Sequence, residues 1–189
     1  MDRDKIIKAL GQSVTRENSD KQQVIRKNRK PGRHLADGFK IALEQVGAGY
    51  QVVDGPDSLR SYIKEEYPEA ISFIDREHWE EYQSPCSKEK LYEIGTVILE
   101  GHFGVSENGA VWLDDTSLPN RLIPFTAERL IICLDSKEIV SDMHDAYERI
   151  SSVKTGFGVF ISGPSKTADI EQHLVYGAHG PIHHMVVLY

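Results

Sequence analysis

The sequence is poor in cysteine, and this limits the cofactors that it can hold by itself. Only two of the 189 residues are cysteines, Cys86 and Cys133. An iron–sulfur cluster usually takes four thiolates, so we expect none bound by this chain. Cys133 lies in the apolar run 130–134 and is typical of a small buried core residue.

Long apolar runs and a positive charge balance are also missing. No run approaches the roughly 20 apolar residues of a membrane span, and the first residues lack a signal-peptide pattern. The chain has 22 basic and 29 acidic residues, a formal charge of −7, which gives no overall attraction for nucleic acid. We interpret the basic tract 26–33 as a solvated linker rather than a binding arm. We therefore expect a cytoplasmic protein.

What is present is the composition of a globular protein, with 40% hydrophobic and 27% charged residues. A length of 189 residues suits one domain with a substantial core. We expect an N-terminal helix and polar linker over residues 1–33. A single α/β domain is expected over residues 34–189.

Strand-like and helix-like runs alternate along most of this domain. The expected helices cover residues 35–46, 59–67 (capped by Ser58), 138–150 and 167–176, with partial helix in the acidic, aromatic segment 76–92. The expected strands cover residues 50–53, 70–74, 97–100, 104–105, 110–113, 130–134, 158–162 and 184–188. Alternation of this kind predicts a layered α/β fold with a mostly parallel sheet. The crowded strands in the middle suggest an inserted antiparallel piece.

Two glycine-rich turns carry most of the candidate ligand-binding residues. The first follows the strand 158–162, and the second, at 177–181, leads into the last strand. Open α/β sheets bind ligands at strand carboxyl ends, so we expect both turns to face one cleft there. The candidates are Gly163, Ser165, Lys166, Thr167, Asp169 and Gly180. The alternative is that these residues only cap a helix. The spacing does not match a phosphate-binding P-loop.

Four of the eight histidines stand at positions 173, 179, 183 and 184. Pro181 prevents a helical pair of ligands, and neighbouring strand residues point to opposite faces, so we expect no metal site. His179, between glycines, is a candidate catalytic acid or base. The alternative is an ordinary hydrogen-bonding residue, which a single histidine in a loop more often is.

Glu107 is the second catalytic candidate. It lies in the turn Ser-Glu-Asn-Gly at 106–109, between two strand-like runs. A glutamate held against a sheet and partly desolvated has a raised pKa and can serve as a base or nucleophile. The alternative is a plain hairpin turn, for which Asn108-Gly109 is a strong signal.

The motif Gly-Pro-Ser-Lys-Thr-Ala-Asp-Ile-Glu at 163–171, followed by Gly-Ala-His-Gly-Pro at 177–181, resembles the lactate-utilisation C-subunit family, or LUD domain. The resemblance covers residues 95–189. It implies a three-layer α/β/α sandwich like that of CoA transferases and sugar-phosphate isomerases (NagB/RpiA-like). It also implies a role in oxidising L-lactate, a small organic acid, to pyruvate beside iron–sulfur partner subunits. Lys166 replaces the family's usual arginine, which weakens any carboxylate-binding role there.

The turn at 106–109 is also similar to the active-site motif of class I CoA transferases. That similarity implies that Glu107 is a nucleophile, although the glycine-rich oxyanion loop of those enzymes is not recognisable upstream. Two alternatives to a lactate-oxidising subunit therefore stay open. One is an acyl or CoA transferase that uses Glu107, and the other is a regulatory module that binds a small acid. The sequence leaves open whether the chain is an enzyme by itself.

Overall fold

The computed structural model describes residues 33–76, 78–153, 156–168, 174–177 and 179–189. They belong to one compact unit, Gly32–Tyr189. The expected N-terminal helix and the polar linker lie outside the described residues, except for Arg33, which is the first residue of a helix. Within the described ranges, no helix is both long and apolar enough to cross a membrane.

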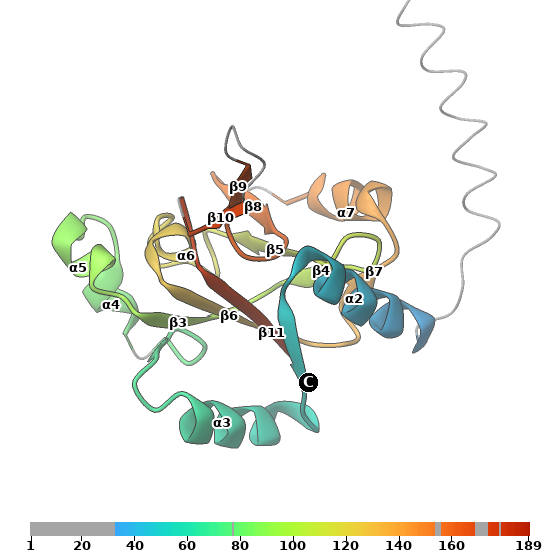
Figure 1. Ribbon diagram of the computed structural model, residues 1–189, viewed down its shortest axis with the longest axis horizontal. Coiled ribbons are helices and arrows are strands. Elements are labelled where there is room, and N and C mark those ends of the chain that lie inside the picture. The colour runs from blue at the N-terminus through green and yellow to red at the C-terminus, as the bar shows by residue number, and fades with distance from the viewer. Residues whose placement is uncertain (1–32, 77, 154–155, 169–173, 178) are drawn as a thin grey trace, which may run out of the picture. The chain divides into compact units, whose positions relative to one another are not determined.

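A five-stranded parallel sheet forms the centre of the fold (Figure 1). In spatial order its strands are β1 (Gly49–Val52), β11 (His183–Leu188), β6 (Arg129–Leu134), β3 (Thr96–Glu100) and β2 (Ile71–Ser72). Every neighbouring pair runs in the same direction. The α/β class with a mostly parallel central sheet is thus confirmed.

Helices pack on both faces of this sheet, and side-chain alternation along the strands decides which residues meet each helix. Phe39 and Leu43 of α2 (Arg33–Val46) belong to the cluster on one face. The strand residues of that cluster are Val97, Leu99, Leu130, Ile132, Leu134, Val186 and Leu188. Leu59 of α3 (Gly55–Glu66) packs on the other face. The strand residues there are Ile98, Ile131, Cys133 and Val187.

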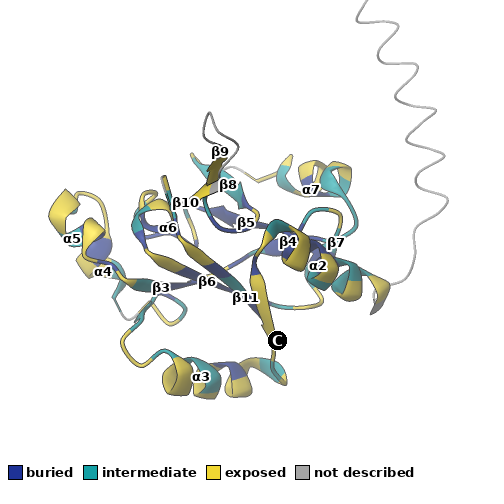
Figure 2. Cartoon of the chain, viewed as in Figure 1, coloured by how far each residue is buried: buried dark blue, intermediate teal, exposed yellow. Residues whose placement is uncertain are grey.

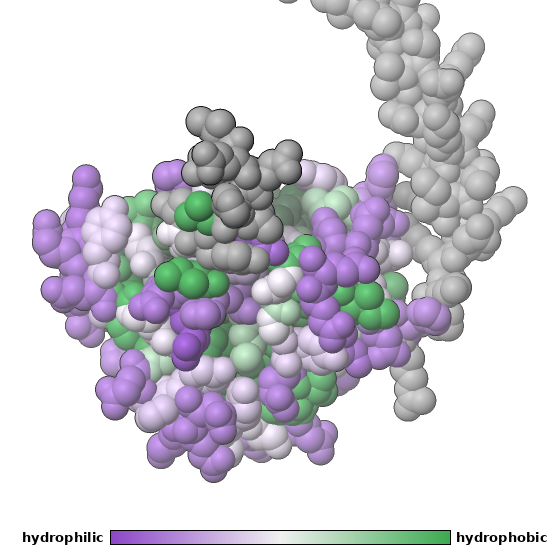
Figure 3. Space-filling view, in the orientation of Figure 1, coloured by the Kyte–Doolittle hydropathy of each residue, from purple (hydrophilic) through white to green (hydrophobic). Residues whose placement is uncertain are grey.

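Burial on both faces explains why the central strands are apolar at almost every position. Figure 2 shows the central strands largely buried, whereas much of α3 is exposed. Hydrophilic residues cover the exposed surface in the region of α3 (Figure 3). The helix α3 begins at Gly55, four residues before the expected start, with Pro56 in its first turn. Ser58 is therefore inside the helix and is not its cap, because proline readily occupies the first helical turn.

A second sheet of four strands packs against the same cluster as α2. Its order is β7 (Ile139–Val140), β4 (Phe103–Val105), β5 (Ala110–Asp114) and β8 (Gly158–Ile161). β5 is antiparallel to both of its neighbours, whereas β4 and β7 are parallel. Val111 and Leu113 join the large cluster, while Phe103 and Trp112 on the opposite side pack with α7 (Met143–Ile150). The expected antiparallel insertion is present.

The helix expected over residues 138–150 is shorter than predicted. Ile139–Val140 forms strand β7, and α7 begins only at Met143. Asp142 is the N-cap residue, and its side chain accepts hydrogen bonds from the backbone N–H groups of His144 and Asp145. A capping aspartate that satisfies these N–H groups sets the start of the helix. The acidic segment 76–92 is helical in parts, as expected, in α4 (Trp79–Tyr82) and α5 (Lys88–Tyr92), and a further short helix is α6 (Ile123–Thr126).

The helix expected over residues 167–176 is wrong where the structure describes that range. Lys166–Ala168 forms strand β9 and Leu174–Tyr176 forms strand β10, and the two strands pair antiparallel. Thr167 and Val175, which face each other in this pair, are β-branched and favour strands. The strand expected over 158–162 is present as β8, but in the second sheet rather than the parallel one. Ser165 therefore does not follow a carboxyl end of the parallel sheet.

Candidate functional site

A polar pocket of about 380 Å³ lies at the carboxyl edge of the parallel sheet. The residues that follow β2, β3, β6 and β11 all contribute to it, because parallel strands end at the same edge. The lining residues are Phe73, Ile74, Arg76, Trp79, Glu100, Gly101, His102, Thr116, Ser117, Asp135, Glu138 and Tyr189. We call this the carboxyl-edge pocket.

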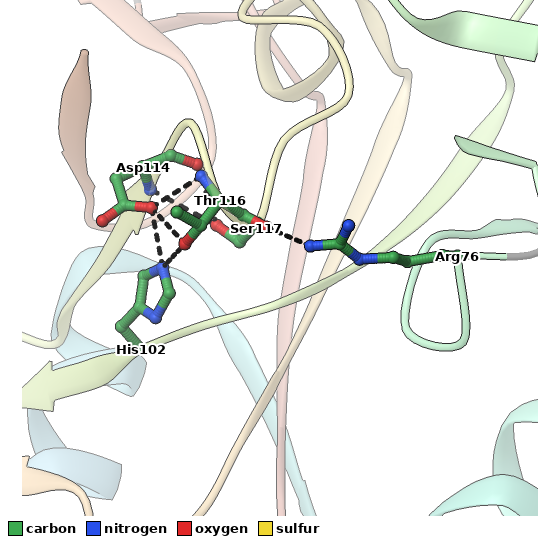
Figure 4. Close-up of polar contacts among 5 residues, drawn as sticks. All are labelled: Arg76, His102, Asp114, Thr116 and Ser117. Atoms are coloured by element: carbon green, nitrogen blue, oxygen red, sulfur yellow. Dashed lines mark hydrogen bonds and ion pairs between the residues drawn. The ribbon is translucent and has the colours of Figure 1, made fainter. Parts of the chain in front are cut away.

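His102 and Asp114 form a hydrogen-bonded pair at this pocket (Figure 4). His102 comes two residues after β3, and Asp114 is the last residue of β5. The His102 Nε2 atom lies 2.9 Å from Asp114 Oδ1 and 3.1 Å from the Thr116 hydroxyl. Asp114 is only 3% exposed, whereas His102 is partly open to solvent. The pair thus joins a buried carboxylate to an accessible imidazole.

Several donors converge on the Asp114 carboxylate. The Thr116 hydroxyl and the Thr116 backbone N–H donate to Asp114 Oδ1 over 2.6 Å and 2.8 Å. Burial by itself raises the pKa of Asp114, but the hydrogen bonds from Thr116 and the adjacent His102 outweigh it and lower the pKa of Asp114 below its usual value. The carboxylate therefore stays ionised at neutral pH.

A tight turn holds these groups in place. The Asp114 backbone N–H donates to the Ser117 hydroxyl over 3.3 Å, and the Ser117 backbone N–H donates to the Asp114 carbonyl over 3.0 Å. The hydrogen bonds from Thr116 to the Asp114 carboxylate belong to the same turn, because the two residues are only two positions apart. Hydroxyl side chains that bond neighbouring backbone groups stabilise such turns. The carboxylate is thus fixed before any ligand arrives.

Arg76 lies at another side of the pocket. Its backbone has φ of 56°, a left-handed conformation that is uncommon for a residue other than glycine. Its guanidinium stacks over the Trp79 ring at 4.5 Å, and Nη2 donates a long hydrogen bond of 3.5 Å to the Thr116 carbonyl. Uncommon backbone conformations of this kind occur preferentially at functional sites. Arg76 can therefore present a cation to the pocket from a defined position.

The remaining polar groups of the pocket come from the ends of β3, β6 and β11. The Tyr189 hydroxyl donates to Glu100 over 3.4 Å, and burial together with Glu100 and Asp135 raises the pKa of Tyr189 to about 12. Glu138 is paired with Arg149 of α7. No group of three or more metal-ligating side chains that could hold an ion is found among the described residues.

Glu107 does not belong to this pocket. It is exposed, and its Oε2 accepts a hydrogen bond of 3.1 Å from the backbone N–H of Met143, at the start of α7. Gly109 has φ of 67°, and Asn108 accepts a hydrogen bond from the Ala110 N–H, as in a hairpin turn. The expected partial desolvation of Glu107 is absent. The structure agrees with the hairpin alternative.

The two glycine-rich turns contact each other, but they do not lie at the carboxyl edge, where a shared cleft was expected. The Ser165 N–H donates to the Pro181 carbonyl over 2.9 Å, and the Gly177 N–H donates to the Ser165 carbonyl over 3.1 Å. His179 and Gly180 line a different pocket of about 580 Å³. Its lining includes Gly95, Glu128 and Ile182, which directly precede β3, β6 and β11. We call it the amino-edge pocket.

Two of the other predicted ligand-binding residues, Gly163 and Lys166, contact the end of α2. Gly163 has φ of 77°, and a Cβ atom there would lie 2.6 Å from the Val46 carbonyl oxygen. The Lys166 ammonium donates to the same carbonyl, at the end of α2. Thr167 is exposed in β9, and Asp169 lies outside the described residues. The predicted set is therefore not brought together in one described cavity.

Sequence reasoning did not single out His102, Asp114 or Arg76. A signal was available, since each follows or ends an expected strand: 97–100, 110–113 and 70–74. The rule that parallel strands collect ligand-binding residues at their carboxyl ends covers His102 and Arg76. It does not cover Asp114, because β5 belongs to the second sheet.

A parallel sheet covered by helices, with a polar pocket at its carboxyl edge, places the chain in the class of α/β proteins, in which ligands generally bind at the carboxyl ends of the strands. The sequence model of the LUD domain matches residues 73–189, more than half of the chain. This chain therefore belongs to the LUD domain family.

Among similar proteins, lactate utilization protein C of Bacillus pumilus is 30% identical over 113 residues, which cover 57% of this chain and 41% of that protein. An uncharacterized protein of Neisseria meningitidis serogroup B is 36% identical over 81 residues, covering 41% of this chain and 35% of that protein. The chain thus spans less than half the length of these relatives.

One solved structure matches closely in fold. It is the crystal structure of a DUF162 family protein from Deinococcus radiodurans, with a TM-score of 0.64 over 85% of this chain and 99% of that chain. The two sequences are 18% identical. The comparison therefore shows a shared fold and nothing further about function.

Proposed function

We propose that this protein takes part in lactate utilisation, as the subunit without iron–sulfur clusters in a complex that oxidises L-lactate to pyruvate. Membership of the LUD family supports the general role, as do relatives named lactate utilization protein C. Within the chain, the proposal assigns the small acid to the carboxyl-edge pocket. The observation that carries this assignment is the cation of Arg76 beside the polar groups of His102 and Thr116.

The chemistry of a 2-hydroxy acid suits these groups. A guanidinium can bind a carboxylate through two parallel N–H groups, and Arg76 supplies such a fork at the pocket wall. His102 and Thr116 offer hydrogen-bonding partners for a hydroxyl or carbonyl oxygen. A volume of about 380 Å³ holds an acid of this size together with water.

The electrons of the reaction are assigned to partner proteins. Oxidation of lactate to pyruvate removes two electrons and two protons, and one-electron iron–sulfur clusters can take up the electrons. The chain has only two cysteines, both free, and burial raises the pKa of the Cys133 thiol to about 12. Neither is placed to bind a cluster with others, so clusters belong to the partners in this proposal.

A covalent CoA-transferase mechanism at Glu107 receives no support from the structure. The carboxylate is exposed, bonds a helix N-terminus and does not line the carboxyl-edge pocket. The third possibility, a module that binds a small acid without turnover, would use the same pocket. It differs from the proposal only in whether electrons leave the bound acid.

Calorimetric titration with L-lactate and pyruvate tests the binding step. We expect the wild type to bind, and Arg76→Gln to lose at least about ten-fold in affinity, since a charge-assisted hydrogen bond is lost. Arg129→Gln is the matched control, because Arg129 is exposed at the start of β6, on the opposite edge of the sheet. Equal affinities for all three proteins would contradict the assignment of the pocket.

Copurification under anaerobic conditions tests the partnership. The proposal predicts that the tagged chain, expressed in its host, recovers cysteine-rich iron–sulfur proteins and that the mixture reduces a dye when lactate is added. The proposed complex would be refuted by two results together. The chain would be recovered alone, and the dye would not be reduced by lactate even after the proteins encoded by adjacent genes are added.

A further inference from the structure

We propose that His102 is the acid–base residue of the carboxyl-edge pocket, exchanging a proton between its Nδ1 atom and the hydroxyl of the bound acid, with Asp114 and Thr116 as positioning residues. The identity of the acid rests on the proposed function. The geometry of the His102–Asp114–Thr116 cluster does not depend on it (Figure 4).

The hydrogen bonds determine which ring nitrogen carries the proton. The Thr116 hydroxyl gives its hydrogen to Asp114 Oδ1 over 2.6 Å. Nε2 of His102 lies 2.9 Å from the same oxygen, and an ionised carboxylate only accepts, so Nε2 must be the donor. In the neutral ring the lone pair is therefore on Nδ1. Among the residues that the structure describes, none hydrogen-bonds Nδ1.

The environment of Asp114 suits the charge that appears when His102 takes up a proton. Asp114 is buried and receives two hydrogen bonds from Thr116, so it is held in one orientation before His102 is charged. A fixed carboxylate behind an imidazole stabilises the imidazolium and keeps the correct nitrogen facing the substrate. Because His102 lines the pocket, its ring is accessible to a ligand while Asp114 stays behind it.

The step moves one proton. The O–H bond of the hydroxy acid breaks, the Nδ1–H bond forms, and the negative charge stays on the substrate oxygen. Under the proposed function, the two electrons of the C–H bond then pass to the iron–sulfur proteins and its proton passes to solvent. His102 returns to its neutral state by releasing its proton to water.

Other ionisable groups border the same cavity and bear on any pH profile. They are Arg76, Glu100, Asp135, Glu138 and Tyr189. The carboxylates among them favour the imidazolium, as Asp114 does, while Arg76 opposes it. Only Asp114 is recorded in hydrogen-bond contact with the ring among ionisable groups of the described residues. A variant at Asp114 thus isolates the positioning effect.

Nitrogen-15 NMR of the imidazoles in the full chain tests the assignment without any substrate. We expect the neutral His102 ring to carry its proton on Nε2, the nitrogen that faces the Asp114 carboxylate. His144→Gln identifies the signal of a control histidine. His144 is exposed on α7, and its Nδ1 atom lies 3.9 Å from Asp142 Oδ1. A neutral His102 ring protonated on Nδ1 would overturn the proposal, whatever the ligand.

Lactate-dependent dye reduction with the partner proteins tests the catalytic role. His102→Gln should lower kcat by at least about 100-fold with little change in KM, the size typical of a lost acid–base group. Asp114→Asn should lower kcat by about ten-fold or more with little change in KM, because His102 loses the carboxylate that orients it. His144→Gln should behave like the wild type.

The outcomes separate the two proposals. An active wild type with His102→Gln at more than half its kcat would refute the role of His102 and leave the lactate function standing. An inactive wild type whose neutral His102 ring is protonated on Nε2 would refute the lactate function while supporting the acid–base geometry. If kcat of Asp114→Glu is as low as that of Asp114→Asn, with normal folding by circular dichroism, the result would support strict positioning by Asp114.

Discussion

At the scale of single residues, two adjacent histidines of β11 have opposite environments. His184 is 5% exposed, and neither of its ring nitrogens has a hydrogen-bond partner among the residues that the structure describes. His183 is exposed. Side chains alternate across a strand, so consecutive histidines face different surroundings. Burial lowers the pKa of His184 to about 4, from 6.5 in a free side chain.

His184→Leu is predicted to change the pH dependence of stability. Below pH 6.5 the unfolded chain binds a proton that folded His184 accepts only near pH 4, so the wild type loses stability as pH falls through this window. The loss amounts to roughly 3 kcal/mol by pH 4. Urea unfolding between pH 7 and pH 4 should therefore show a flatter curve for His184→Leu.

The same variant should also be more stable than the wild type at pH 7, by about 1 kcal/mol, because two unsatisfied nitrogens are removed from the interior. His183→Leu, at the exposed neighbour, is the matched control and should leave the stability at pH 7 nearly unchanged. If the unfolding free energies of wild type and His184→Leu differ by the same amount at every pH, His184 does not titrate in this window.

At the scale of elements, the end of α2 and the first glycine-rich turn stabilise each other. The Val46 carbonyl, at the end of α2, accepts from the Lys166 ammonium, and Gly163 approaches the same carbonyl closely. A cation at a helix C-terminus satisfies a free carbonyl and opposes the helix dipole. Residues predicted as ligand-binding thus have a packing role that the structure makes evident.

Gly163→Ala is predicted to destabilise the protein by about 1–3 kcal/mol, since the left-handed φ is strained for alanine and the new Cβ would meet the Val46 oxygen. Thermal unfolding measures the effect. Gly95→Ala is the matched control, because a Cβ there meets nothing within 4 Å and no left-handed φ is required. Equal melting temperatures for the two variants would contradict this packing.

The late start of α7 leads to a second prediction for an element. Asp142→Ala should cost about 1 kcal/mol of unfolding free energy, because the side chain caps two backbone N–H groups. Asp142→Asn should retain most of the stability, since asparagine caps as well as aspartate does. Chemical denaturation compares the three proteins. A helix starting at residue 138, as the hydrophobic spacing suggested, would make both substitutions neutral.

At the scale of the whole molecule, the parallel sheet has a pocket at each of its two edges. The carboxyl-edge pocket is lined by residues that follow β2, β3, β6 and β11 in the chain. The amino-edge pocket is lined by residues that precede β3, β6 and β11. Exposed apolar side chains, including Tyr92 and Phe125, border the amino-edge pocket. Among the residues that line it, the amino-edge pocket has Glu93, Glu128 and His179 but no arginine or lysine, whereas the carboxyl-edge pocket has Arg76. This difference in chemistry is the reason why we propose the carboxyl edge, and not the amino edge, as the site of the small acid.

Hydrogen exchange read by mass spectrometry should distinguish the two edges. With L-lactate at 100 times its Kd, which stabilises the bound state by about 2.7 kcal/mol, we expect slower exchange at residues 73–76, 100–102 and 114–117. Residues 177–182 and 92–95, at the amino edge, should be unaffected. Slower exchange only at the amino edge would show that the ligand binds in the amino-edge pocket instead.

Much of the fold was predictable because its signals are local. The apolar run 130–134 became β6, and α2 ends at Val46 as expected, directly before Gly47 with its φ of 78°. The predicted site was less accurate. Residues 158–162 form a strand, as predicted, but nothing in that run specifies β5 as its partner. The prediction of a helix over 167–176 was wrong in the described part of that range, because strand pairing between β9 and β10 outweighed the local helical spacing.

The sequence by itself determined the α/β class, the alternation of helices and strands, and the resemblance to the LUD family, because each depends on residues close together in the chain. Only the tertiary structure decided which sheet each strand joins, and therefore which polar residues meet. His102 and Asp114 are brought within 2.9 Å by the pairing of residues on either side of the β4–β5 hairpin. Arg76 comes from the segment that connects the parallel strands β2 and β3. Strand pairing is a long-range choice made by the packing of the whole core, and local patterns do not encode it.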